Sequence, residues 1–424
     1  MTKYAKHSGM TRNKKEDALK KNHQFAVAVL VLSLSSLSAI TVTPVADLSL
    51  MGGQYYFGSD GSTGASLDLF CSPVLNFSRS SALLPIITLR YRGTKDVTDL
   101  VGGGTLVQQT ADGGLSLKYI YKFPSGLKIK PRIGYSIEYL KETNDEQWGK
   151  GLFDYNKMIA GIELEQQLNP VFKLRGGLDY YTMRYPNYAS LIYNQNFQTS
   201  IDTVTYSELS ASAGKNVLDY NTVAAFLETT QKLDDIWIGQ AKLDVMLKNF
   251  TDAKTVDESG TFTSTLRQDI IYLLTLGTNL TAERAILGLA NSFEFYDSNQ
   301  NSFDSANAVY VANYYDFWED SLSPSVTFLL GAADKPARFT LYYNLAWRQY
   351  TGRLAQKADA SYLSDKTYQQ TNTLGLSLKI PIINNLSAQI ETNYRDATSN
   401  MRYEKNYKYN YYVFNYFLGI GWQY

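Results

Sequence analysis

Basic residues recur at every second position in several segments of the chain. Lys128, Lys130 and Arg132 follow this spacing, and Lys173 and Arg175 repeat it later. Alternate residues of an extended strand lie on the same face, so the spacing predicts rows of cationic side chains. Cations that line a passage favour anions. The residues predicted to form this pore-lining basic wall are Arg90, Arg92, Lys118, Lys122, Lys128, Lys130, Arg132, Lys173 and Arg175.

Carboxylates with the same spacing allow two interpretations. Glu163 and Glu165 share one face of a predicted strand, and Glu138 and Asp179 lie on neighbouring predicted strands. Paired carboxylates can perform the acid–base chemistry of a glycosidase without histidine. More often such carboxylates are polar wall residues that pair with nearby cations. Anion preference and internal ion pairing of the basic wall therefore both stay open from the sequence alone.

The first 46 residues have the organisation of an export signal. Lysine and arginine dominate the charged positions up to residue 21, and an apolar run at 25–34 follows, too short to span a bilayer. Small residues then recur between 38 and 46. We predict a signal peptide over 1–46, cleaved between 38 and 46, and one mature domain over 47–424. A retained membrane anchor is the alternative.

Both histidines of the chain, His7 and His23, fall within this predicted signal. The mature chain would then lack imidazole, so neither a Ser–His hydrolase site nor a histidine-ligated metal site can be built in it. The sequence thus predicts a protein that is not an enzyme and holds no metal or other cofactor. The 40 Lys and Arg residues balance 40 Asp and Glu residues, so no overall positive field favours nucleic acid.

After residue 46 the apolar residues alternate with a period of two. At the C-terminus, Tyr416, Leu418, Ile420, Trp422 and Tyr424 share one face, with other residues on the opposite face. These runs exceed an ordinary globular strand, and about ten tilted residues suffice to cross a bilayer. The 34 tyrosines suit the aromatic girdles of a membrane barrel. The pattern predicts an all-β protein with a single transmembrane antiparallel β-barrel.

Short and long connections alternate along the chain, which is typical of such a barrel with short periplasmic turns and long extracellular loops. Seven turns and eight loops connect about 16 strands. Segment 309–331 could hold one long strand or a broken pair, so 14 to 18 strands are possible. A soluble, exported sandwich or propeller is the alternative fold. The turns are predicted near 78–81, 124–126, 169–170, 234–235, 281–283, 333–336 and 383–385, and the loops near 59–63, 94–112, 141–150, 184–216, 251–264, 297–307, 351–366 and 396–406.

With these features and its aromatic last residue, the chain resembles the bacterial outer-membrane β-barrel class over 46–424. In that class the last strand is the signal read by the barrel-assembly machinery. The residues that match its alternating pattern are Tyr416, Leu418, Ile420, Trp422 and Tyr424, although the last residue of the class is often Phe. The resemblance implies the outer membrane as location, with its lipids and the assembly machinery as partners. No particular porin or transporter family is matched.

Three functions fit such a barrel. The first is a porin-like channel for small hydrophilic solutes, with an anion preference from the basic wall. The second is an export conduit for an anionic polysaccharide or other polymer, and the third is a plugged structural or adhesion barrel. The longest connection, 184–216, is a candidate to fold into the lumen and narrow it, because loops of this length are usually functional or disordered. The alternative for this segment is an exterior loop.

Overall fold

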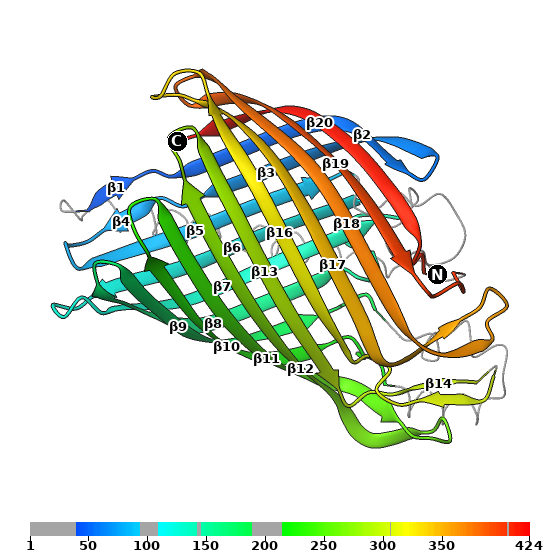
Figure 1. The fold of residues 1–424 in the computed structure, drawn as a ribbon. Coiled ribbons are helices and arrows are strands. Elements are labelled where there is room, and N and C mark those ends of the chain that lie inside the picture. Colours follow the sequence, from blue (N-terminus) through cyan, green and yellow to red (C-terminus); the bar gives the residue numbers. More distant parts are fainter. Residues whose placement is uncertain (1–39, 94–108, 142–145, 189–213, 306, 405–406) are drawn as a thin grey trace, which may run out of the picture.

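The computed structural model describes residues 40–93, 109–141, 146–188, 214–305, 307–404 and 407–424. Most strands of these residues belong to one curved β-sheet (Figure 1). Eighteen strands belong to this sheet, and two of them, β1 and β4, are only three residues long. The other sixteen are β2 (Ala46–Phe57), β3 (Asp60–Cys71), β5 (Ser81–Arg92), β6 (Gln109–Lys122), β7 (Lys128–Lys141), β8 (Tyr155–Asn169), β9 (Phe172–Arg184), β10 (Tyr220–Lys232), β11 (Trp237–Val256), β12 (Phe262–Thr281), β13 (Ala285–Ser298), β16 (Phe317–Leu330), β17 (Ala337–Gln356), β18 (Tyr362–Ile383), β19 (Leu386–Ser399) and β20 (Tyr411–Gln423).

The sheet closes through its first and last long strands. β2 pairs antiparallel with β3 on one side and with β20 on the other. The short strands β1 (Thr41–Thr43) and β4 (Val74–Asn76) pair with each other beside this junction. Closure leaves no edge among the sixteen described long strands, which is what a bilayer requires of a sheet. The predicted all-β fold, a closed antiparallel barrel of sixteen strands, is confirmed.

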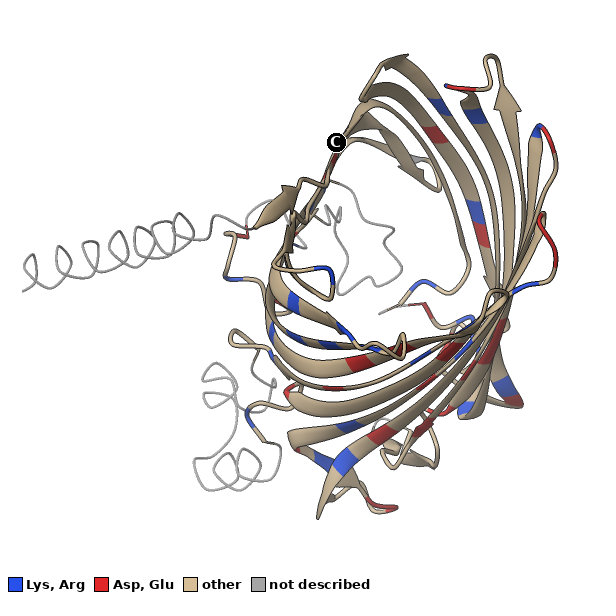
Figure 2. Cartoon of the chain, turned by 90° about the vertical axis from the view of Figure 1, so that its left-hand side faces the viewer, with Lys and Arg blue, Asp and Glu red and all other residues tan. Residues whose placement is uncertain are grey.

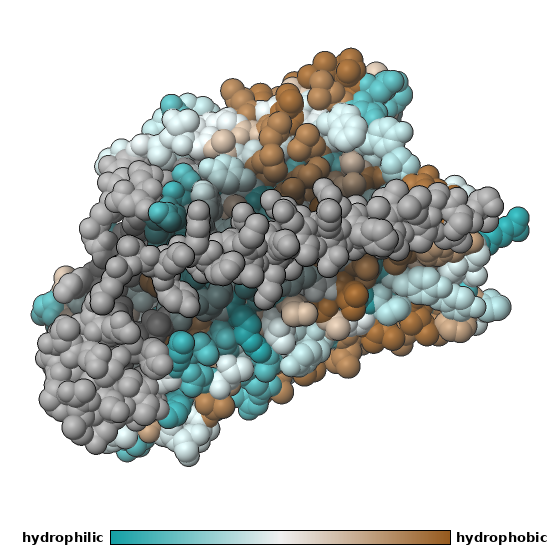
Figure 3. All heavy atoms as spheres, turned by 180° about the vertical axis from the view of Figure 1, so that it is seen from behind, coloured by the Kyte–Doolittle hydropathy of each residue, from teal (hydrophilic) through white to brown (hydrophobic). Residues whose placement is uncertain are grey.

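Large apolar side chains cover the outside of the barrel. On β20, Leu418 and Ile420 are exposed, whereas Val413 and Asn415 at alternate positions are buried. The same alternation runs along β6 and β8, and Figure 3 shows apolar residues gathered on the outer surface. No helix among the described residues is long and apolar enough to cross a membrane. The residues of the predicted assembly signal, all exposed on the outer side, are Tyr416, Leu418, Ile420, Trp422 and Tyr424. The chain is therefore a transmembrane β-barrel of the outer-membrane type.

All seven predicted short turns lie between barrel strands, but three predicted loops are wrong. Segments 251–264 and 351–366 are mostly strand, forming the β11–β12 and β17–β18 hairpins that project beyond the rim in Figure 1. Both hairpins contain register shifts. Their polar composition suggested loops, but strands that extend into water need no apolar face. The predicted loop 59–63 lies largely within β3, which leaves a turn at 58–59.

Segment 309–331 is a broken pair. β15 (Val309–Val311) pairs with β14 (Ser302–Asp304) in a separate two-stranded sheet, and β16 begins afterwards. Pro324 lies inside β16, where the pairing to β17 skips from Leu322 to Ser325. Proline has no N–H to donate, so this gap has a local cause.

Several predicted features lie outside the described residues. They include 1–39, which holds most of the predicted signal with His7 and His23, and most of the loop 94–112. The proposed lumen loop 184–216 also falls mostly outside, since 189–213 is not described.

Leu418→Lys is expected to prevent folding into a bilayer. β20 places this side chain against lipid in the middle of the strand, where a basic residue destabilises a barrel by about 2–4 kcal/mol. Phe417→Lys is the matched control, because the neighbouring residue lines a hollow inside the barrel. The measurement is the fraction of heat-modifiable, folded protein after incubation with lipid vesicles. Equal folded fractions for the two variants would contradict the assignment of faces.

Candidate functional site: the charged inner wall

The predicted basic residues lie on the inner face of the adjacent strands β5 to β9. On β6, for example, exposed Leu117 marks the outer face, and Figure 2 shows basic and acidic positions on neighbouring strands of the wall. Seven of the nine form ion pairs with described carboxylates. Nearest the loop side, Arg90 lies 3.1 Å from Asp112, and Arg92 donates to both oxygens of Asp68 at 2.8 and 2.9 Å. Internal pairing is therefore a property of this wall.

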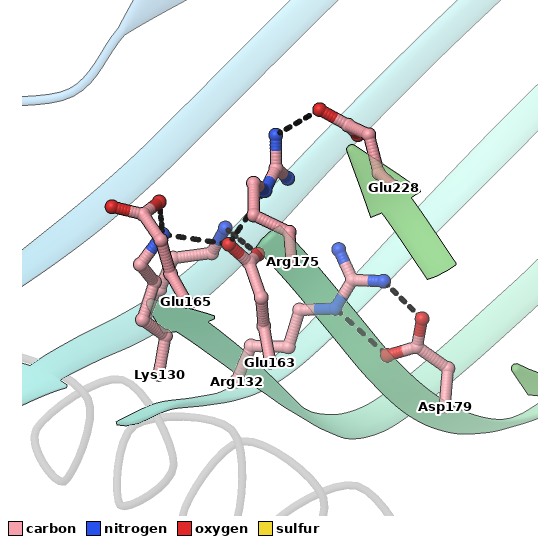
Figure 4. Close-up of polar contacts among 8 residues, drawn as sticks. Lys130, Arg132, Glu163, Glu165, Arg175, Asp179 and Glu228 are labelled. Atoms are coloured by element: carbon pink, nitrogen blue, oxygen red, sulfur yellow. Dashed lines mark hydrogen bonds and ion pairs between the residues drawn. The ribbon is translucent and has the colours of Figure 1, made fainter. Parts of the chain in front are cut away.

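Glu163 on β8 connects the central part of the network (Figure 4). Its carboxylate accepts hydrogen bonds from Lys130 at 2.6 Å and from Lys118 at 3.3 Å. Arg175 on β9 donates to the same carboxylate at 3.2 Å. Two residues further along β8, Glu165 accepts a second bond from Lys130 at 2.7 Å. The two glutamates considered as catalytic acids in the sequence are thus partners of lysine and arginine.

The strand register alternates charge across five strands. From β7 to β11, the directly opposed residues are Lys128, Glu165, Arg175, Glu228 and Lys242. Lys128 lies 2.6 Å from Glu165, and Arg175 lies 3.1 Å from Glu228. Opposite charges that face each other across antiparallel strands stabilise the pairing. The ladder therefore holds the inner face of these strands in one register.

Most carboxylates of the network are more buried than the cations that pair with them, although Lys130 is buried as well. The side chains of Glu163 and Glu228 are each 8% exposed, and that of Asp179 is 11% exposed. The side chains of Lys128 and Arg132 are 37% and 35% exposed. A solute in the lumen thus meets ammonium and guanidinium groups before it meets the carboxylates. The wall presents a cationic surface over an acidic layer.

A glycine on the strand between them allows two charged residues to form an ion pair. Arg132 on β7, Gly161 on β8 and Asp179 on β9 are directly opposed in register. The Asp179 carboxylate reaches over β8 and accepts two hydrogen bonds from Arg132, one of them at 2.9 Å. A Cβ at position 161 would lie 1.8 Å from the Asp179 Oδ1 atom. The ion pair therefore requires glycine at this position.

Two predicted basic residues, Lys122 and Lys173, form no ion pair within the described part of the chain. Sequence reasoning also missed several residues of this wall, among them Asp68, Asp112, Lys157 and Glu228. Lys157 lies 4.1 Å from the Tyr181 ring centroid and Glu228 pairs with Arg175. Alternation with exposed apolar neighbours could have identified both. The described residues contain no group of three His, Cys, Asp or Glu side chains suited to a metal ion.

At the loop end of the barrel, the described part of the connection 299–316 packs against arginines of β12 and β17. Arg353 of β17 lies 4.1 Å from the Tyr314 ring centroid and donates to the Tyr314 carbonyl oxygen at 3.4 Å. On the other flank, Arg267 of β12 lies 4.4 Å from the Tyr315 ring centroid. Guanidinium groups over tyrosine rings are stabilised by cation–π attraction. Neighbouring strands thus hold the connection on both sides.

A second connection, 400–410, meets the first at Arg353. Tyr409 is buried beside the Arg353 guanidinium, and the Arg402 N–H donates to the Gln356 carbonyl oxygen at 2.8 Å. Burial raises the pKa of Tyr409 to about 12, although the nearby guanidinium opposes this change. The phenol therefore stays uncharged at neutral pH. These two connections lie at the loop end of the barrel, and Tyr188, in the described part of 184–216, lies near Tyr315 of the first connection.

The sequence matches no family model and no curated protein. Among solved structures, it is similar to OprB of Pseudomonas putida, with 11% identity, a TM-score of 0.49, and 90% of this chain and 94% of that chain covered. It is also similar to the outer-membrane-expressed OmpT of Vibrio cholerae, with 11% identity, a TM-score of 0.45 and coverage of 91% and 98%. The anion-selective porin of Comamonas acidovorans has 8% identity, a TM-score of 0.41 and coverage of 91% and 100%. These TM-scores lie below 0.5, so the architecture rests on the strand register of this chain.

Gly161→Val is expected to lower the stability of the barrel by about 1–3 kcal/mol, because the new side chain displaces Asp179 and leaves charged groups without their partners. The matched control is Gly277→Val on β12, where a Cβ meets nothing within 4 Å. The measurement is the urea midpoint of unfolding in lipid vesicles. If both valine variants unfold at the same urea concentration, Gly161 is not needed for the ion pair.

Proposed function

We propose that the protein is an outer-membrane channel that passes small hydrophilic solutes and prefers anions. The observation that carries the proposal is the inner wall of β5–β10, where Lys128, Arg132 and Arg175 are more exposed than the carboxylates that pair with them. A barrel of sixteen strands is wide enough to enclose an aqueous passage. Polar residues inside and apolar residues outside are the distribution that such a passage needs.

The anion preference follows from how closely a permeating ion approaches the cations of the wall, rather than from the net charge of the wall. Four buried carboxylates face five cations in the central network, so the wall is close to neutral. A permeating anion approaches the exposed ends of Lys128 and Arg132 more closely than the carboxylates beneath them. Coulomb interactions weaken with distance, so the exposed layer dominates at contact. Lys122 and Lys173 add positive charge to the same wall.

The alternative functions need other features. A polymer conduit would share the basic wall, but the connections 299–316 and 400–410 occupy part of the loop end and favour small solutes. A plugged barrel would not conduct ions.

We further propose that the barrel-assembly machinery recognises the exposed face of β20, and that outer-membrane lipids surround the barrel.

Removing two exposed cations is expected to shift ion selectivity. In the double variant Lys128→Gln with Arg132→Gln, Glu165 and Asp179 lose cationic partners, so the chloride-to-potassium permeability ratio should fall several-fold. The measurement is the reversal potential across a planar bilayer in a KCl gradient. The control is Lys335→Gln with Lys357→Gln, which removes the same charge from turns outside the barrel wall. An unchanged ratio in the first variant would remove the basic wall from the permeation path.

The preference is also expected to depend on ionic strength. The Debye length is about 30 Å at 0.01 M salt and about 3 Å at 1 M, so mobile ions screen the wall much more strongly in concentrated salt. The chloride-to-potassium permeability ratio of the unmodified protein should therefore decrease steadily as the KCl concentration rises at a fixed gradient. A ratio that is independent of salt would indicate that wall charge does not produce the preference.

A further inference from the structure

A second polar surface lies mainly on the wall opposite the central ion-pair network and reaches Arg92 of the basic wall at its edge. It is a hollow of about 520 Å³ on the inner faces of β17–β20, β2, β3 and β5. In the closed sheet, β19 is eight strands away from β9 in either direction, so the centre of the hollow faces the ion-pair network across the lumen. We call it the amide hollow, because Asn344, Asn393 and Asn415 line it.

A tyrosine ring forms part of the amide hollow, and the backbone of a neighbouring strand fixes its position. Tyr342 on β17 lies directly opposite Gly375 on β18. A Cβ at position 375 would lie 2.0 Å from the Cζ atom of the Tyr342 ring. The ring therefore rests over the backbone of the neighbouring strand, and glycine provides the space. A side chain held in this way is an aromatic surface of defined position at the lumen.

The three amides leave hydrogen-bonding groups available in the hollow. Asn344 donates both amide hydrogens, to the Ser321 and Ser323 hydroxyls at 2.8 and 2.7 Å, which leaves its carbonyl oxygen as an acceptor. Asn415 donates to the Asn393 carbonyl oxygen at 3.1 Å, which leaves the Asn393 amide hydrogens as donors. The hollow thus offers donors and acceptors side by side.

The charged groups of the hollow balance one another. Arg92 is engaged by Asp68 through two hydrogen bonds. Arg395 donates to the Thr373 hydroxyl at 3.4 Å. Glu391 is exposed to the lumen and forms no ion pair within the described residues. Two guanidinium groups and two carboxylates give no net charge, so the hollow favours a neutral solute over an ion.

We propose that the amide hollow binds a neutral, polyhydroxylated solute such as a mono- or disaccharide. Each hydroxyl of such a solute both donates and accepts, so adjacent amide donors, amide acceptors and the Glu391 carboxylate can satisfy several hydroxyls together. The Tyr342 ring contacts the apolar C–H groups of the same solute. The volume lies within the range of about 300–1,000 Å³ found for small-molecule sites. The inference rests on the proposed channel function only for access of the solute to the hollow.

The test measures ion current through the purified barrel while glucose or sucrose is added. Both sugars should reduce the current with saturation, whereas polyethylene glycol of matched size should reduce it without saturation. Glu391→Gln should raise the half-saturating sugar concentration about tenfold, because the hydrogen bond to a charged acceptor is lost. Tyr342→Leu should also raise the half-saturating sugar concentration. Glu294→Gln on β13 is the matched control, since this residue does not line the hollow.

The outcomes separate the two proposals. Conductance with an anion preference but with no saturation by either sugar would overturn the amide hollow as a binding site and leave the channel intact. An equal rise of the half-saturating sugar concentration in the Glu391 and Glu294 variants would also overturn the binding site. If the barrel does not conduct, the channel proposal fails. Titration calorimetry of sucrose with the detergent-solubilised barrel then tests whether the amide hollow binds sugar. Heat of binding that Glu391→Gln reduces supports the site, and its absence rejects it.

Discussion

In a bilayer every backbone N–H and C=O group must find its partner inside the protein, and here the pairing of β2 with β20 completes that requirement. Once the sheet is closed, each strand has one face toward lipid and one toward the lumen. The period-two alternation of the sequence therefore separates apolar chemistry from polar chemistry. Leu418 can face lipid while Asn415 on the same strand faces inward. Because the inner face need not form an apolar core, it can carry ion pairs and amides.

The layering of charge on the inner wall follows from side-chain length. Lysine and arginine have long stems that can lie along a wall and leave the charged end in water. Glutamate and aspartate are shorter, so their carboxylates stay near the sheet, where burial is unfavourable unless cations pair with them. Glu163 contacts Lys118, Lys130 and Arg175. Several partners for one carboxylate offset its burial and leave the cations at the surface of the wall.

The sequence predicted features that depend on residues close together in the chain. Alternation indicated the strands and the outward face of β20, and local turn residues indicated the seven short turns. It failed at 251–264 and 351–366, because polar residues in a strand beyond the membrane resemble those of a loop. It named Asp179 as a possible partner of the basic wall but could not assign its cation, since Arg132 and Asp179 are 47 residues apart and meet only through the register of three strands.

The amide hollow was even less accessible to sequence reasoning, because Asn344 and Arg92 come together only when the barrel closes. Closure also explains why two unlike walls face each other. Strands β5–β11 carry most of the ion pairs, whereas the strands that follow β13 carry mainly amides and hydroxyls, such as Asn344 with Ser321, beside the ion pair of Arg348 with Glu319. In the proposed channel, the charge of one wall governs which ions enter, and the hydrogen-bonding groups of the other govern how long a hydroxylated solute stays. Because these properties belong to different strands, substitution on one wall can change one of them without changing the other.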